Sequence, residues 1–136
     1  MTEPEVAGEE SIPKAIEFPD GLPGFPQARH FRLQPLDPDL APFAALRSQD
    51  LEGLEFVVVP PGAVFEDYTV EVPDDDANRL DLREADDAVV MVIVTVSRPP
   101  TANLLGPLVV NRRTGRGRQV VMVGSDYDVR TPLPAG

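Results

Sequence analysis

Short apolar segments separated by turn-forming residues run through most of the chain. Each segment is rich in Val, Ile or Phe, and together they cover 12–18, 30–36, 43–47, 55–59, 68–72, 88–96, 104–110 and 119–123. The 16 prolines lie mainly in the breaks, and proline cannot donate a hydrogen bond to a strand ladder. This pattern predicts an all-β fold, which we expect to be a small antiparallel β-barrel.

The last two apolar segments predict a β-hairpin. The connection between them contains Asn111, Gly115 and Gly117. These residue types accept the positive φ that a tight turn needs. We therefore expect two paired strands on either side of this connection.

A short helix is predicted only near residues 74–84. Asp74 or Asp75 is suited to cap its N-terminus, and Leu80 and Leu82 are placed to face inward. We expect a helical turn or two there in an otherwise all-β chain.

The segment 89–96 differs from the other predicted strands because nearly all of its residues are apolar. A half-exposed antiparallel strand alternates apolar and polar residues, so both faces of this strand must avoid water. Two interpretations remain open. Either the fold covers both faces, or one face is left as an apolar groove for a partner helix.

Composition limits the possible functions. With 136 residues, no cysteine and one histidine, the chain has the size of one domain, and thiolate metal sites and cysteine catalysis are excluded. We expect a disordered acidic tail at 1–10 and a single domain at 11–136. A net charge of −11 argues against direct nucleic-acid binding. The longest apolar run is too short to cross a membrane as a helix, and the acidic N-terminus is unlike a secretory signal, so a cytoplasmic protein is expected.

Three features suggest chemistry, but each has a simpler explanation. Asp74–Asn78 resembles the start of a calcium loop, but it lacks the required glycine and glutamate, so we expect no metal. His30 has no catalytic motif around it, and we interpret it as structural. The arginine-rich loop at 112–118 has no interleaved aromatic residues and is interpreted as a solvated hairpin tip. We therefore predict no catalytic residues and no cofactor.

Five sequence blocks resemble the family of bacterial flagellar assembly factors called FliW, and they occur in the family's order. The blocks are 18–25 (Phe-Pro-Asp-Gly-Leu-Pro-Gly-Phe), 42–48 (Pro-Phe-Ala-Ala-Leu-Arg-Ser), 94–96 (Val-Thr-Val), 101–111 (Thr-Ala-Asn-Leu-Leu-Gly-Pro-Leu-Val-Val-Asn) and 125–133 (Ser-Asp-Tyr-Asp-Val-Arg-Thr-Pro-Leu). The block that begins Thr-Ala-Asn-Leu is the most specific. Two departures lie in loops or at strand ends: Arg47 stands where the family often has glutamine, and the connection at Pro99–Pro100 is short.

The resemblance implies a cytoplasmic regulator without catalytic activity. FliW-like proteins bind the translational repressor CsrA as allosteric antagonists, and they also bind flagellin, which couples flagellin translation to flagellum assembly. The resemblance thus implies CsrA and flagellin as partners, and we expect a monomer that binds neither nucleic acid nor membrane.

The segment around residues 62–71 is our candidate for the partner-binding surface. Phe65 and Tyr68 are aromatic residues of the kind that anchor protein interfaces, and acidic residues surround them. The candidate residues are Val64, Phe65, Glu66, Asp67, Tyr68 and Glu71. A second interpretation is that the two aromatic side chains belong to the core.

One alternative function stays open on the residues alone. An unrelated small acidic β-barrel could bind a small ligand or hydrolyse it with carboxylates. Such a protein should have a concave polar pocket with converging ionisable groups. A protein-binding regulator should instead have a filled interior and an exposed apolar or acidic patch.

Overall fold

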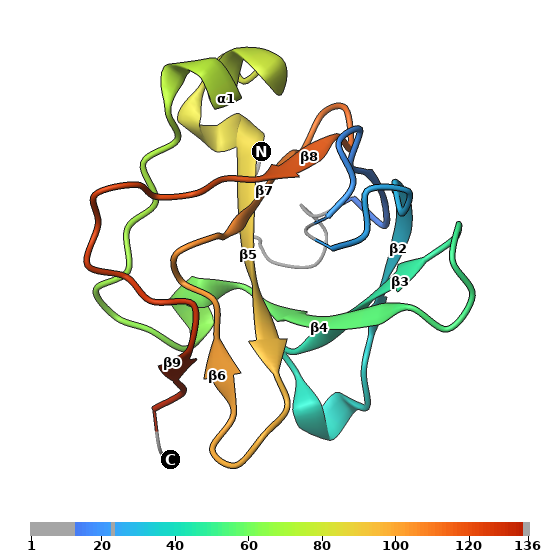
Figure 1. Ribbon diagram of the computed structural model, residues 1–136, viewed down its shortest axis with the longest axis vertical. Coiled ribbons are helices and arrows are strands. Elements are labelled where there is room, and N and C mark those ends of the chain that lie inside the picture. Colours follow the sequence, from blue (N-terminus) through green and yellow to red (C-terminus); the bar gives the residue numbers. More distant parts are fainter. Residues whose placement is uncertain (1–12, 23, 135–136) are drawn as a thin grey trace, which may run out of the picture.

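The computed structural model describes residues 13–22 and 24–134, so the expected acidic tail at 1–10 lies outside the described residues. Antiparallel strands dominate the described part (Figure 1). They are β1 (Ala15–Glu17), β2 (His30–Pro35), β3 (Ala44–Ser48), β4 (Glu55–Val59), β5 (Ala88–Thr95), β6 (Thr101–Ala102), β7 (Leu108–Asn111), β8 (Gly117–Gln119) and β9 (Thr131–Pro132). The helical elements are α1 (Asp74–Arg79) and 3₁₀ turns at Pro38–Leu40, Pro61–Ala63 and Ala85–Asp87. The predicted all-β class is confirmed.

The strands form one nine-stranded sheet that branches at β5. Strands β1 to β5 pair in chain order, after which β5 pairs with β6 along one part of its length and with β7 along the other. The path ends at β9 on one branch and at β8 on the other. An isolated bridge from Glu17 to Arg116 brings β1 close to the β7–β8 hairpin, but the sheet does not close. The predicted barrel is therefore only a loose description.

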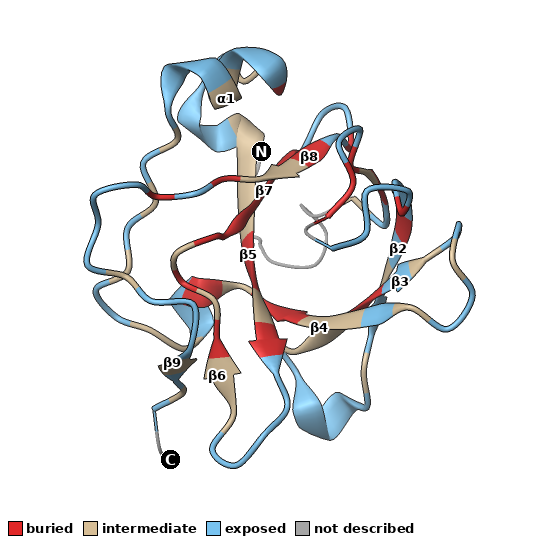
Figure 2. Ribbon diagram, in the orientation of Figure 1, coloured by how far each residue is buried: buried red, intermediate tan, exposed pale blue. Residues whose placement is uncertain are grey.

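Strand β5 packs apolar side chains on both of its faces. Met91 and Ile93 belong to a cluster with Phe18, Phe31 and Leu46. Val92 and Val94, which alternate with them, belong to a second cluster around Val59, Ala102 and Leu104. Figure 2 shows the buried residues concentrated along β5 and the strands beside it. The fold itself thus accounts for the continuous apolar run, which is the first of the two interpretations of this segment.

The predicted hairpin is formed by β7 and β8, with Val110 opposite Gly117. Gly115 has a φ of 78°, as the turn requires. Gly117 serves another purpose, because a Cβ at this position would lie 2.8 Å from Cε1 of Phe18. The ladder ends at Gln119, earlier than predicted, although the Val120 N–H still donates to the Pro107 carbonyl at 2.9 Å.

Helix α1 confirms the predicted helical region. Leu80, which follows it, is buried, and Leu82 packs against the same cluster. The predicted aspartate cap is wrong, because the N-cap residue is Pro73 and no side chain of the described residues caps the helix. Aspartates instead occupy the first turn, where the positive end of the helix dipole favours negative charge.

The predicted strand at 68–72 forms no ladder with the described residues. Its side chains nevertheless alternate as in a strand, since Thr69 and Glu71 are exposed whereas Val70 and Val72 pack against the cluster around Leu80. The segment runs beside the chain that follows β8 (Figure 1), because the Thr69 N–H donates to the Tyr127 hydroxyl at 3.2 Å. The sequence pattern identified a side-chain alternation, but not a pairing partner.

Candidate functional site

The six predicted partner-binding residues lie on one irregular segment, but they differ in exposure. Val64, Phe65 and Tyr68 are half-buried and pack against the cluster around Val59 and Val92. The three acidic residues are exposed: Glu66, Asp67 and Glu71. The segment therefore presents carboxylates to solvent, while its apolar side chains help to hold it on the sheet.

Tyr68 has a structural role. Its hydroxyl donates to the Leu104 carbonyl at 2.7 Å, and its ring meets Tyr127 edge-on with centroids 4.7 Å apart. Burial raises the pKa of the Tyr68 phenol above its ordinary value, and the neighbouring Tyr127 adds to this effect. Removing this side chain would disturb the attachment of the segment as well as any partner contact.

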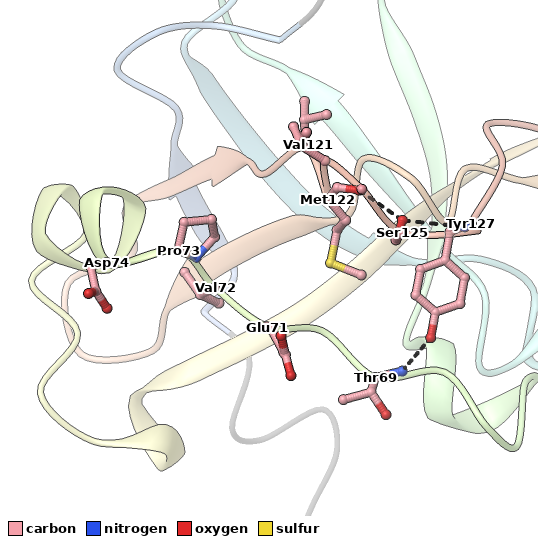
Figure 3. Close-up of a pocket in the computed structure, with 11 residues that line it drawn as sticks. Thr69, Glu71, Val72, Pro73, Asp74, Val121, Met122, Ser125 and Tyr127 are labelled. Atoms are coloured by element: carbon pink, nitrogen blue, oxygen red, sulfur yellow. Dashed lines mark hydrogen bonds between the residues drawn. The ribbon is translucent and has the colours of Figure 1, made fainter.

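An open groove of about 710 Å³ lies next to this segment (Figure 3). One wall is formed by residues 69 and 71–74, and the opposite wall by residues 121–125 and 127. In Figure 3, Met122 and Tyr127 extend from the second wall toward the first. Of the six predicted residues, Glu71 lines the groove.

The groove combines an apolar wall with negative charge. Val121 is 53% exposed and Val123 is 89% exposed, which is unusual for valine. Within the described part of the chain, the charged residues that line the groove are Glu71 and Asp74, and the lining there includes no lysine or arginine. These properties suit a partner that carries apolar and basic side chains together.

The second wall of the groove was not among the predicted site residues. Val121 and Val123 lie in an apolar segment, and such a segment is normally assigned to a buried strand. They are exposed because they alternate with the buried Val120 and Met122, whose N–H groups donate to the carbonyls of Pro107 and Leu105 at 2.9 Å. The one available signal was the pair of glycine and serine residues, Gly124 and Ser125, directly after the segment.

The arginines of the 112–118 loop contact acidic side chains and carbonyls of the protein itself. Arg118 reaches Asp20 at 2.6 Å and Asp76 at 2.8 Å, and Arg113 reaches Asp87 at 3.2 Å. Arg113 also donates to the Asp81 carbonyl at 2.7 Å, Arg112 donates to the Asp86 carbonyl, and Arg116 pairs with Glu17. The loop is thus tied to β1 and to the region around α1, whereas a simple solvated tip was predicted.

Asn111 connects the same hairpin to the end of the helical region. Its side chain is fully buried, and its amide donates to the carbonyls of Leu80 at 2.7 Å and Asp81 at 3.1 Å. Its side-chain oxygen accepts from the N–H groups of Arg113 at 2.7 Å and Thr114 at 3.3 Å. The asparagine therefore satisfies polar groups on both elements.

His30 is paired with Asp50, with its Nδ1 3.2 Å from a carboxylate oxygen. The N–H groups of His30 and Arg29 both donate to Asp50 at 2.8 Å. These two main-chain bonds hold the pKa of Asp50 below its ordinary value. This arrangement fixes His30 at the start of β2, in line with its structural interpretation.

The aspartates that resemble the start of a calcium loop have cationic neighbours. Asp75 pairs with Arg79 at 3.1 Å, and Asp76 pairs with Arg118. Over the residues that the structure describes, no cluster of three or more histidine and carboxylate side chains could hold a metal ion. The described part of the chain also contains no helix with the length and apolarity needed to cross a membrane.

Fold and groove together define a small all-β protein with an acidic surface groove. The family described as FliW protein matches residues 2–133 of this chain. The flagellar assembly factor FliW of Bacillus subtilis (strain 168) is 39% identical over 121 residues, which are 87% of this chain and 84% of that protein. The flagellar assembly factor FliW of Geobacter sulfurreducens (strain ATCC 51573 / DSM 12127 / PCA) is 34% identical over 132 residues, which are 95% of this chain and 80% of that protein.

A solved structure agrees with these sequence relationships. A crystal structure of the flagellar assembly factor FliW superposes with a TM-score of 0.81 at 28% identity, covering 96% of this chain and 92% of that one. The chain belongs to the FliW family, and this supports a role in flagellar assembly. Family membership also removes the alternative of an unrelated β-barrel.

Proposed function

We propose that this protein is a non-enzymatic cytoplasmic regulator that binds the translational repressor CsrA, as an allosteric antagonist, and also binds flagellin. Competition between the two partners would couple flagellin translation to flagellum assembly. Membership in the FliW family is the observation that carries this proposal. In this view residues 11–136 act as one domain, and the protein works as a monomer.

Surface charge supports the proposed pairing with CsrA. A protein that binds RNA needs lysine and arginine side chains for the phosphates, whereas this chain has a net charge of −11. Opposite charges increase the rate of encounter between two proteins. The exposed carboxylates of Glu66, Asp67 and Glu71 are our candidates for contacts with such a basic surface.

The apolar and acidic character of the groove supports the proposed pairing with flagellin. Amphipathic segments of a partner bind surfaces that offer apolar contacts. The valines of the groove wall provide such contacts within reach of the candidate segment.

Titration of the purified protein against CsrA and against flagellin from the same cell, by isothermal calorimetry, tests the proposal. Saturable binding of each partner, and displacement of one by the other, are expected. Absence of binding to both partners would contradict it.

A charge-reversal variant tests the candidate residues. Phe65→Ala with Tyr68→Ala is unsuited to this purpose, because both side chains pack against an apolar cluster. Glu66→Lys with Asp67→Lys changes exposed side chains only. Association with CsrA should become several-fold slower at low salt. Glu52→Lys with Asp39→Lys, also exposed, makes the same charge change elsewhere and should have a smaller effect. Equal effects of the two variants on the association rate would contradict the assignment of Glu66 and Asp67 to the CsrA contact.

A further inference from the structure

The main chain of residues 70–72 runs along the groove without a hydrogen-bonding partner among the described residues. Among residues 13–22 and 24–134, no hydrogen bond involves the main-chain N–H or carbonyl of Val70, Glu71 or Val72. The side chains alternate between exposed and half-buried, as in a strand, and the half-buried ones hold the segment on the cluster around Leu80. The segment therefore has the side-chain pattern of an edge strand without a neighbour.

The hydrogen bond of Thr69 indicates which main-chain groups face the groove. Its N–H donates to the hydroxyl of Tyr127, which lines the groove on the opposite wall. In a strand, the N–H and carbonyl of one residue point to the same edge, and those of the next residue point to the other edge. Glu71 has the same orientation as Thr69, so its N–H and carbonyl face the groove together with the Thr69 carbonyl.

We infer that the groove takes up an extended peptide segment of a partner protein, which pairs with residues 69–71 as an added strand. Strand addition of this kind obtains affinity from main-chain hydrogen bonds and selectivity from alternate side chains. The Val121 and Val123 wall accepts apolar side chains, while Glu71 and Asp74 accept basic ones. The occupant is thus a segment in which apolar residues alternate with lysine or arginine.

Charge favours such a partner over a second copy of this chain. The chain carries a net charge of −11, and Glu71 lies at the middle of the unpaired edge. Charged residues and proline on an edge strand hinder pairing between identical copies, and Pro73 ends this edge. A basic strand is attracted by the same side chains.

The inference goes beyond the proposed function, because it defines the occupant by its chemistry, and its test uses neither CsrA nor flagellin. The probe is a short capped peptide of alternating arginine and valine. A second peptide of the same sequence is methylated on every main-chain nitrogen, which removes the ladder donors on both of its edges while keeping charge and side chains.

Binding is measured by calorimetry, and amide hydrogen exchange by NMR locates it. The unmethylated peptide should bind about tenfold more tightly, since each of its few ladder hydrogen bonds contributes about a factor of two to ten. Exchange of the Glu71 amide should slow on binding, while that of the Val70 amide, which points away, should change little. Glu71→Gln should weaken binding several-fold at low salt, and Glu52→Gln, on an exposed loop, should not.

Three results would each overturn the inference. The first is equal affinity for both peptides, which would mean that charge alone attracts them. The second is no binding, or no protection of the Glu71 amide. The third is concentration-dependent dimerisation in the ultracentrifuge that the peptide reverses, since a second copy would then be the occupant.

Discussion

Replacement of Asn111 by leucine should destabilise the protein strongly, because this side chain satisfies polar groups on two elements. Leucine has a similar volume but leaves the carbonyl of Leu80 without its buried partner at 2.7 Å. An unpaired buried carbonyl costs about 1–3 kcal/mol. The bonds to Asp81 and Arg113 are partly accessible to water and add about 1 kcal/mol each. We expect a total loss of about 3–5 kcal/mol.

Urea denaturation followed by far-UV circular dichroism measures this loss as a lower midpoint with an unchanged slope. The melting temperature should fall by about 10 °C or more. Asn103→Leu is the control, because the Asn103 side-chain oxygen accepts one bond, from the Gly106 N–H at 2.9 Å, and should lose about 1 kcal/mol. If the Asn111 variant is no less stable than the Asn103 variant, the buried bonds of Asn111 between the hairpin and the α1 region do not stabilise the fold as expected.

Three further predictions concern stability. Gly117→Ala should lower the free energy of unfolding by about 1–3 kcal/mol, because the added methyl group would meet Phe18 at 2.8 Å. Gly62→Ala, which has open space around it, should lower it less, and equal melting temperatures of the two variants would refute this. Tyr68→Phe should lose about 1 kcal/mol with its hydrogen bond, measured by urea denaturation, and an unchanged midpoint would show that the bond contributes nothing. Asp50 has a lowered pKa in the folded protein, so its stabilising effect is present above its ordinary pKa of 3.8 and is lost as the pH falls below that value. Asp50→Asn should therefore destabilise the protein at pH 6, and the difference in unfolding free energy from the wild type should shrink as the pH falls. A difference that grows on acidification would contradict this prediction.

Much of the fold could be predicted because its determinants are local. The β7–β8 hairpin followed from its turn residues, and Gly115 has the expected positive φ. The helix followed from acidic residues ahead of Leu80, although the cap was assigned wrongly because an aspartate suits both a cap and a first turn.

The remaining features depend on contacts between distant residues. A β-like alternation at 69–72 does not specify whether another strand lies within hydrogen-bonding distance. Likewise, the unbroken apolar run at 120–123 does not show that Val121 and Val123 face solvent while the residues that alternate with them are buried. Pairing partners and strand ends are set by the whole fold, so the groove between these two segments could not be predicted from either alone.

The ion pairs of the loop arginines also could not be predicted from the sequence. Arg118 and Asp20 are far apart in the chain, and the structure brings them within 2.6 Å. A cluster of four arginines in one loop indicates only a positive surface as long as the positions of the carboxylates are unknown.

Strand β5 has a consequence for how the molecule melts. It is paired with β4, β6 and β7, and its side chains enter the apolar clusters on both of its faces. If β5 detached from the sheet, the apolar clusters on both of its faces would be exposed to water. The described strands should therefore unfold cooperatively in a single transition. Strand β5 pairs with β4, which lies far from it in the sequence, so docking of β5 closes a long loop. Folding should therefore be slow compared with that of a helical protein of this length.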